Sequence, residues 1–156
     1  MGNTASKAWE KLGRNAVGRW LFSRVVCLKA PYFASIRPLF RRLEVGLCEV
    51  EFRKRRGVLN HIGTVHAIAM CNAAELAGGL VTEVTLPTTH RWIPKGMSVE
   101  YLSTATTDLV VTARCKLPES LAEQQTLTVT VEVCDTAGTI VARALIDMYV
   151  SRRRPR

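Results

Sequence analysis

The chain has 156 residues, of which 47% are hydrophobic and 22% are charged, and its formal net charge is +9. That length suits one domain with a core of its own, and ordinary hydrophobic and charged fractions exclude a chain that is disordered or membrane-embedded throughout. Five widely spaced cysteines, without a CxxC pair, indicate reduced thiols and a cytoplasmic protein. The spacing of Cys and His predicts no metal site.

The positive charge is concentrated in two runs, Arg53-Lys54-Arg55-Arg56 and the tail at residues 152–156. Such runs attract phosphates on nucleic acid, on anionic lipid or on coenzyme A, and they also occur in solvated loops and frayed tails. No nucleic-acid-binding motif accompanies them, so we expect no nucleic-acid partner.

Residues 1–39 are predicted to form a helical extension. The first residues fit the short pattern for myristoylation of Gly2, which has meaning only in a eukaryotic cell. A helical period from residue 4 to about residue 30 predicts one amphipathic helix, which packs either on the domain or on a membrane surface, so that membrane contact would involve residues 1–30. Its apolar side comprises Trp9, Leu12, Ala16, Val17, Trp20 and Cys27, and its basic side comprises Lys7, Lys11 and Arg14.

Residues 40–151 are predicted to form one α+β domain, followed by the basic tail. Alternating apolar residues predict a strand over residues 43–53, and a 3.6-residue period predicts a helix over about 65–83. Four later stretches rich in Val, Ile, Thr and Tyr are strand candidates: residues 97–103, 109–116, 126–134 and 139–150. Residues 106–108 join the first two tightly, and residues 135–138 form a turn between the last two, with Gly138 suited to a positive φ. This order predicts an antiparallel sheet packed on one long helix.

Glu75 is the one acid in the small, apolar run from residue 60 to residue 79. At about 100° per residue, the predicted core stripe lies on the opposite side of the helix, so Glu75 faces away from the sheet. The Glu75 face comprises Ile68, Cys71, Asn72, Gly78, Gly79 and Thr82, and the core stripe comprises Ala69, Met70, Ala73, Ala77, Leu80 and Val84. Mid-helix glycines cost about 1 kcal/mol each relative to alanine, and a second copy of the helix crossing near the Gly pair would explain them.

The loop before this helix supplies a candidate polar site. The stretch from residue 63 to residue 67 leads into the helix N-terminus, whose free N–H groups can polarise a carbonyl oxygen and stabilise an oxyanion. His66 lies nine residues before Glu75, about 13 Å along the helix axis and on the opposite face, so the two can share a site only between two chains. With Asn60 ahead of the turn, these parts fit hydrolysis of an ester or thioester. A structural Asn-His loop with a buried structural glutamate is the alternative.

The run Asn60-x-x-Gly63-Thr64-Val65-His66, followed by Glu75 and Ala77-Gly78, resembles the helix signature of hotdog-fold thioesterases of the phenylacetate-pathway type. It is still more similar to the hotdog branch known as domain of unknown function 4442. The resemblance continues through residues 94–102, where such proteins begin the strand after the helix, and covers about residues 40–150. It implies a hotdog fold, in which a curved antiparallel sheet of five to six strands wraps around a long central helix. It also implies a homodimer, or a dimer of dimers, with active sites between subunits.

The same resemblance implies a role for each matched residue. Asn60 and His66 correspond to polar residues of the loop entering the helix, and Glu75 corresponds to the helical acid that acts as nucleophile or general base. The backbone N–H of Ala67 corresponds to the oxyanion donor. The implied substrate is an acyl-CoA, and no further cofactor is implied. The predicted substrate-binding residues are Gly63, Thr64, Ile68 and Gly79 near the thioester, Arg53, Arg55 and Arg91 near the coenzyme A phosphates, and Trp92 near the acyl group.

One departure from the family pattern bears on turnover. The pair after the histidine is usually Gly-Gly in the thioesterases, and here it is Ala67-Ile68. Because Ile68 is expected to crowd an approaching thioester, a hotdog protein that binds acyl-CoA or another acyl ligand without hydrolysing it is the main alternative. A peripheral membrane interaction protein is the second.

Overall fold

The computed structural model describes residues 3–153, and within them the chain forms three α-helices, two 3₁₀ helices and six strands. In chain order these are α1 (Thr4–Leu12), α2 (Ala16–Lys29), η1 (Pro31–Ile36), β1 (Leu39–Glu44), β2 (Leu47–Phe52), η2 (Arg56–Val58), α3 (Ala67–Thr85), β3 (His90–Tyr101), β4 (Leu109–Arg114), β5 (Gln124–Cys134) and β6 (Ile140–Arg152). The myristoylation pattern at Gly2 and the tail residues 154–156 lie outside the described residues.

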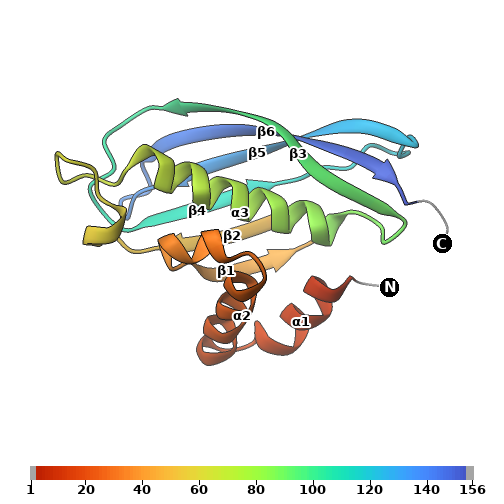
Figure 1. Ribbon diagram of the computed structural model, residues 1–156, viewed down its shortest axis with the longest axis horizontal. Helices are drawn as coiled ribbons and strands as arrows, with labels where there is room; N and C mark the ends of the chain where they lie inside the picture. Colours follow the sequence, from red (N-terminus) through yellow and green to blue (C-terminus); the bar gives the residue numbers. More distant parts are fainter. Residues whose placement is uncertain (1–2, 154–156) are drawn as a thin grey trace.

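The six strands of the described chain form one antiparallel sheet in the order β1-β2-β4-β5-β6-β3. The sheet curves along α3, which lies against one face, and α1 and α2 pack at the β1 edge (Figure 1). Along β5 and β6, buried and exposed side chains alternate, as expected where one face of a sheet covers a core. The predicted α+β arrangement, a curved antiparallel sheet on a long helix, is confirmed.

Helix α3 lies at the centre of the core. Four members of the predicted core stripe are buried, namely Met70, Ala73, Ala77 and Val84, and the other two, Ala69 and Leu80, are half-buried against the same cluster. By length and apolarity α3 would pass for a membrane span, the only such helix within residues 3–153. However, 67% of its apolar window is buried inside this fold, so the core accounts for its composition.

The paired glycines of α3 make room for the chain's own sheet. A side-chain carbon on Gly78 would come within 2.8 Å of Ile146 Cδ1 in β6, and one on Gly79 within 2.9 Å of Trp92 Cη2 in β3. The prediction that a second copy of the helix crosses at these glycines is therefore wrong. Asn72 and Thr82 of the predicted Glu75 face are also buried, which leaves Ile68, Cys71 and Glu75 as its outward side.

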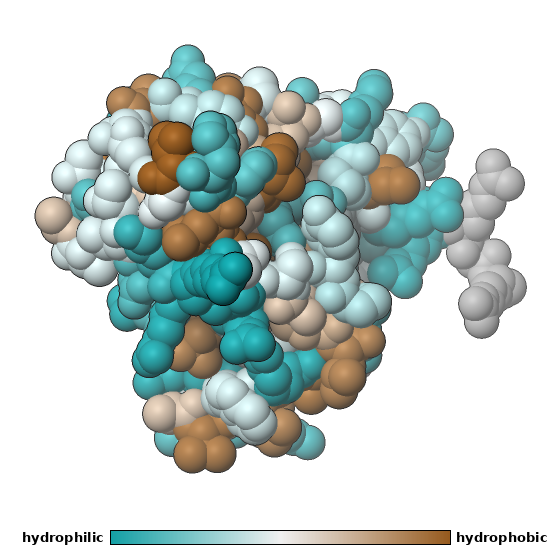
Figure 2. Space-filling view, turned by 60° about the vertical axis from the view of Figure 1, so that its left-hand side comes forward, coloured by the Kyte–Doolittle hydropathy of each residue, from teal (hydrophilic) through white to brown (hydrophobic). Residues whose placement is uncertain are grey.

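The N-terminal segment forms two helices where the sequence predicts one. Gly13 ends α1, and the side chain of Asn15 caps α2 by accepting a hydrogen bond from the N–H of Gly18. The predicted apolar side is consequently divided. Trp9, Leu12 and Cys27 pack inward, whereas Val17 and Trp20 are exposed. Hydrophobic residues appear at the lower end of the molecule in Figure 2, where α2 lies in Figure 1.

Both N-terminal helices are joined to the sheet by packing and hydrogen bonds. The ring of Trp9 in α1 lies 5.1 Å from that of Phe22 in α2, which lies 5.2 Å from that of Phe40 in β1. The buried hydroxyl of Ser23 donates to the carbonyl of Arg19 at 2.8 Å and accepts from the N–H of Phe40 at 3.0 Å. Residues of α2 are therefore buried in the core, and α1 packs against that core.

The strands differ from the sequence prediction at the start of the domain and around β3. The single strand predicted over residues 43–53 is a hairpin of β1 and β2, which turns at Gly46 with φ of +82°. β3 begins at His90 rather than residue 97, and it pairs with β6 rather than with the next strand in sequence. The turn at residues 135–138 is confirmed, with φ of +83° at Gly138.

Candidate active site

The loop entering α3 is closed by the side chain of Asn60. Its Nδ2 donates to Thr64 Oγ1 at 2.7 Å, and its Oδ1 accepts from the N–H groups of Ile62 and Thr64, each at 3.1 Å. Gly63, at the tip, has φ of +80°, a conformation that suits glycine. Asn60, Gly63 and Thr64 thus shape this loop, and the bonds made by Asn60 leave one Nδ2 hydrogen for a ligand.

His66 and Ala67 form the N-terminus of α3. Nδ1 of His66 accepts the N–H of Ile68 at 3.0 Å, so the neutral ring carries its proton on Nε2 and can donate it to a ligand. Among residues 3–153, the structure gives the N–H of Ala67 no hydrogen-bond acceptor. The Ala67 N–H is therefore free for an oxyanion, as the sequence predicts.

A small hollow of about 180 Å³ adjoins this helix end, lined by His66, Ile68 and Asn72 of the α3 region together with residues of η1 and η2. Asn72 is only 6% exposed and donates from Nδ2 to Ser35 Oγ at 2.9 Å. Its Oδ1 is buried without a partner in the described chain. An amide in an otherwise apolar helix was the only sequence signal for this group, and Ser35 gave none.

Glu75 lies on the outward side of α3, exposed to solvent, beside the middle of β3. Two contacts fix this placement. One turn before Glu75, the Sγ of Cys71 lies 3.1 Å from the hydroxyl of Tyr101 at the end of β3, and one turn after it Gly79 packs under Trp92 near the start of β3. The Cys71 hydrogen bond, with burial, raises the pKa of Tyr101 to about 12. Glu75 and His66 are not brought together within one chain, since the helix separates them by about 13 Å along its axis.

Strand β3 is an open edge of the sheet. It pairs with β6 on one side, and no strand of residues 3–153 pairs with its other side. Met97, near the middle of this strand, is 40% exposed, and Ile68 at the start of α3 is 55% exposed. Exposed edges of this length invite pairing with another chain. The outward side of α3 and the open side of β3 thus form one continuous surface, referred to below as the α3–β3 face.

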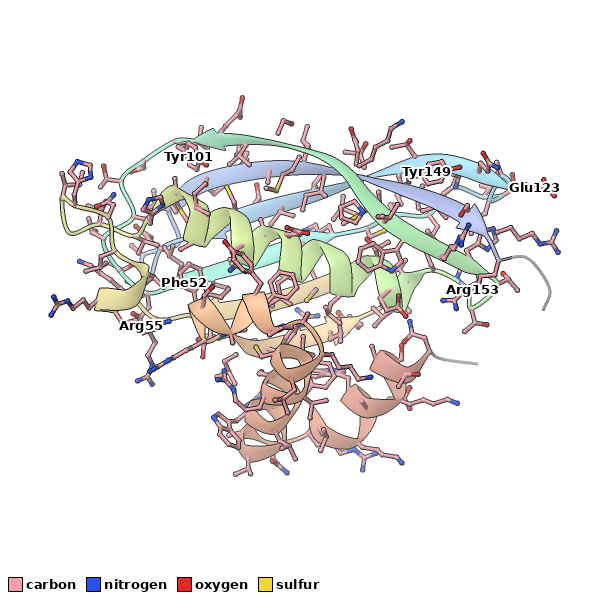
Figure 3. The ribbon with its side chains drawn as sticks, viewed as in Figure 1. Phe52, Arg55, Tyr101, Glu123, Tyr149 and Arg153 are labelled. Atoms are coloured by element: carbon pink, nitrogen blue, oxygen red, sulfur yellow. The ribbon has the colours of Figure 1, made fainter. Side chains whose placement is uncertain are left out.

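The predicted phosphate-binding arginines are at opposite ends of the molecule. Arg53 and Arg55 line a hollow of about 610 Å³ beside α2, near the start of α3. Arg91, whose Nε donates to Ser151 Oγ at 3.1 Å, lines a second hollow of about 840 Å³ with Glu123, Tyr149 and Arg153. Figure 3 shows Arg55 and Tyr101 at one end and Glu123, Tyr149 and Arg153 at the other. One chain therefore does not bring Arg91 together with Arg53 and Arg55.

Trp92, predicted to line an acyl pocket, is half-buried against Gly79. Its Nε1 donates to Glu83 Oε2 at 2.7 Å, and its ring covers the backbone of Gly79. In this arrangement Gly79 is buried and has no surface for a ligand.

Within the described residues, no cluster of three or more His, Cys, Asp or Glu side chains has the geometry of a metal site.

Comparison with known proteins identifies the family and the fold. The family model described as a domain of unknown function, DUF4442, matches residues 18–150, so it includes most of α2. The crystal structure described as genomics APC5556 is 45% identical, with a TM-score of 0.83, and the alignment covers 96% of this chain and 98% of that chain. No curated protein matches the sequence.

More distant structures share the architecture. Thioesterase HI1161 from Haemophilus influenzae has a TM-score of 0.71 at 10% identity, covering 82% of this chain and 87% of its own. A Pseudomonas aeruginosa protein of unknown function, described as a probable thioesterase, has a TM-score of 0.73 at 20% identity, covering 84% and 93%. The chain therefore belongs to the DUF4442 family, and it has the hotdog fold that these structures share.

Proposed function

We propose that the protein is an acyl-CoA thioesterase whose active sites form between two copies of the chain. The observation that carries this proposal is the α3–β3 face, which exposes Glu75 beside an open sheet edge. The free N–H of Ala67 lies at the N-terminus of the same helix. Pairing two copies through β3 would extend the sheet and bring Glu75 of one chain toward Ala67 of the other. The fold shared with thioesterases supports the same reaction class.

The proposed chemistry needs only water as the second reactant. The carbonyl oxygen of the thioester accepts the Ala67 N–H, which stabilises the negative charge that develops there. In one route, Glu75 of the other chain takes a proton from water while the water oxygen bonds to the carbonyl carbon. In the direct route, the Glu75 carboxylate itself attacks that carbon. The C–S bond then breaks, and the leaving thiolate takes the proton that Glu75 removed from water, or a solvent proton in the direct route, which gives coenzyme A. In the direct route, water then hydrolyses the acyl anhydride formed with Glu75.

Ile68 favours a second candidate, a protein that binds an acyl-CoA without hydrolysing it. Its side chain is 55% exposed beside the Ala67 N–H, where thioesterases of this type usually carry glycine. The two candidates separate in one assay: release of free thiol from a panel of short, medium, long and aromatic acyl-CoAs. Saturable binding without thiol release would support the binding protein. Faster release by Ile68→Gly would identify the isoleucine as the obstruction.

Glu75→Gln should abolish hydrolysis and leave the fold unchanged, because the amide fills the same exposed position but cannot take a proton. Ala67→Pro should do the same for the oxyanion contact. Proline is well accepted at the first helical position and removes only the N–H that is already free. His66, with φ of −65° and ψ of 137°, has the extended backbone that a residue before proline needs.

Mixing these two inactive variants tests whether the site spans two chains. In a random mixture half of the dimers are hybrids, and each hybrid has one intact site if Ala67 and Glu75 come from different chains. About a quarter of the wild-type rate should then return after the chains exchange. If both residues act within one chain, every hybrid is dead and mixing restores nothing. Unchanged activity of either single variant would remove that residue from the mechanism.

A further inference from the structure

Helix α2 carries an apolar stripe on its outer side that nothing in the described chain covers. Val17 is 75% exposed, Trp20 56%, Leu21 43% and Leu28 82%. Their spacing places them on one side of the helix, while Phe22 and Cys27 pack inward. A helix that is apolar on both sides needs a second partner, and an exposed apolar stripe of this kind usually marks an interaction site.

The surroundings of this stripe are strongly basic. From residue 11 to residue 43 the sequence contains no Asp or Glu and eight cations. Arg41 and Arg42 of β1 are ion-paired with Glu51 and Glu44, and the other six are Lys11, Arg14, Arg19, Arg24, Lys29 and Arg37. The 610 Å³ hollow beside α2 joins the two features, because Trp20 of the stripe lines it together with four arginines, Arg24, Arg37, Arg53 and Arg55. We name this hollow the arginine groove.

The arginine groove has a surplus of positive charge that its own residues do not neutralise. Glu51 is the one acid that lines it, and Glu51 is already ion-paired with Arg41. The guanidinium groups of Arg37 and Arg55 lie close enough to repel each other, which, after burial, helps to lower the pKa of Arg55. Arg37 also holds a left-handed backbone, φ 50° and ψ 59°, which is unfavourable for a residue with a side chain. Such strain often accompanies a binding function.

We propose that the α2 stripe and the arginine groove dock the protein on a bilayer that contains anionic phospholipid. The helix lies in the interface, its apolar stripe enters the boundary between headgroups and acyl chains, and the groove receives a lipid phosphate. Trp20 and Tyr32, which is 71% exposed just after the helix, are residue types enriched at that depth. Figure 2 shows hydrophobic residues at this end of the molecule directly below a hydrophilic band.

Charge favours a bilayer over a second copy of the chain. Two copies meeting symmetrically through this surface would bring two arginine grooves together, with like charges repelling across the contact. An anionic bilayer instead complements both parts of the surface at once. A soluble phosphate compound such as coenzyme A would satisfy the groove and leave the apolar stripe in water.

The test uses the full chain and sedimentation with vesicles of phosphatidylcholine, with and without phosphatidylglycerol. Wild type should bind only the anionic vesicles, and added salt should weaken that binding. Val17→Ser with Leu28→Ser should lower vesicle binding at least about tenfold, because two apolar side chains no longer enter the bilayer. The variant should stay folded, because both side chains lie outside the core. Arg37→Gly with Arg53→Ala should lower it about thirtyfold, since each cation near an anionic surface contributes about a fivefold factor. Glycine suits the backbone at position 37, so this variant should stay folded.

A matched control takes the same kinds of side chain from the outer face of the sheet. Leu145, 50% exposed, and Arg114 share a hollow there, and Leu145→Ser with Arg114→Gln should leave vesicle binding at the wild-type level. We choose point variants rather than deletion of residues 1–30, because that deletion would remove the packed rings of Trp9 and Phe22.

Four results would overturn the proposal. The first two are equal binding of the wild type to neutral vesicles and full vesicle binding by the Val17 and Leu28 variant. The third is a wild-type oligomer that dissociates in this variant. The fourth is a chain that binds free coenzyme A in its arginine groove and does not bind vesicles. Thioester hydrolysis in solution should be unchanged in the Val17 and Leu28 variant. Failure of the docking proposal is thus distinguishable from failure of the proposed activity.

Discussion

The indole ring of Trp92 lies over the backbone of Gly79, so that a side-chain carbon at position 79 would come within 2.9 Å of Cη2. The ring is not free to move aside, because its Nε1 donates to Glu83. Gly79→Ala should therefore lower the free energy of unfolding by about 1–2 kcal/mol, although alanine is favoured over glycine in a helix by about 1 kcal/mol. Chemical denaturation measures the difference.

A double-mutant cycle with Trp92→Leu separates the crowding from the helix propensity. With the smaller leucine in place, Gly79→Ala should become neutral or stabilise the protein by up to about 1 kcal/mol. The same loss in both backgrounds would show that the Trp92 ring is not the cause.

The hydroxyl of Ser23 joins α2 to β1, because it accepts the buried N–H of Phe40 at 3.0 Å. Ser23→Ala leaves that N–H without a partner and should cost about 1–3 kcal/mol in a single unfolding transition. Ser120→Ala, on an exposed loop, is the control and should change little. If residues 1–39 were an extension that unfolds separately, Ser23→Ala would shift only an early, minor transition.

Tyr101 should be the last tyrosine to lose its proton. The hydrogen bond to Cys71, with burial, raises its pKa to about 12, against about 10 for an ordinary tyrosine. Between these values the folded chain holds more protons than the unfolded chain, so Tyr101 makes stability fall as pH rises from about 10 toward 12. Phenolate absorbance should show one late-titrating tyrosine, which Tyr101→Phe removes and Cys71→Ala brings to lower pH. A late component that persists in Tyr101→Phe would contradict the assignment.

Asn60 should matter more for the order of its loop than for the stability of the domain. Asn60→Ala removes all three side-chain hydrogen bonds, whereas Asn60→Asp keeps the acceptor and loses only the donor to Thr64. Hydrogen exchange over residues 59–66 should therefore speed up strongly in the first variant and less in the second. His61→Ala, at an exposed neighbour, should leave exchange unchanged. Equal effects of all three substitutions would show that the amide does not hold the loop.

The sequence was informative where one local period dominates. The core stripe of α3, the last three strands and the turn at Gly138 follow from hydrophobic spacing and turn chemistry. The β1–β2 hairpin was missed because apolar alternation runs straight through Val45 and Gly46 into β2. The early part of β3 was missed because Pro94 and Gly96 interrupt the pattern, where the structure has a register shift.

The candidate site was predictable only in its local part. The stretch from Asn60 to Ala67 is contiguous, so its loop and helix start could be inferred directly. Ser35 reaches Asn72 from a distant part of the chain, and Trp92 reaches Gly79 only because β3 pairs with β6. No periodicity within one segment encodes such contacts. The glycine pair consequently pointed to a second helix when its own sheet was the neighbour.

The three rings of Trp9, Phe22 and Phe40 also determine how the protein would respond to a surface. They join α1, α2 and β1 by direct edge-to-face contacts between the rings. If α2 inserts into a bilayer, the entire domain would therefore have a fixed tilt relative to the membrane. The height of Glu75 above the lipid phosphates would then be set by the fold. Substitutions that weaken the aromatic cluster would let the domain change its orientation relative to the membrane, without altering any residue that contacts lipid or thioester.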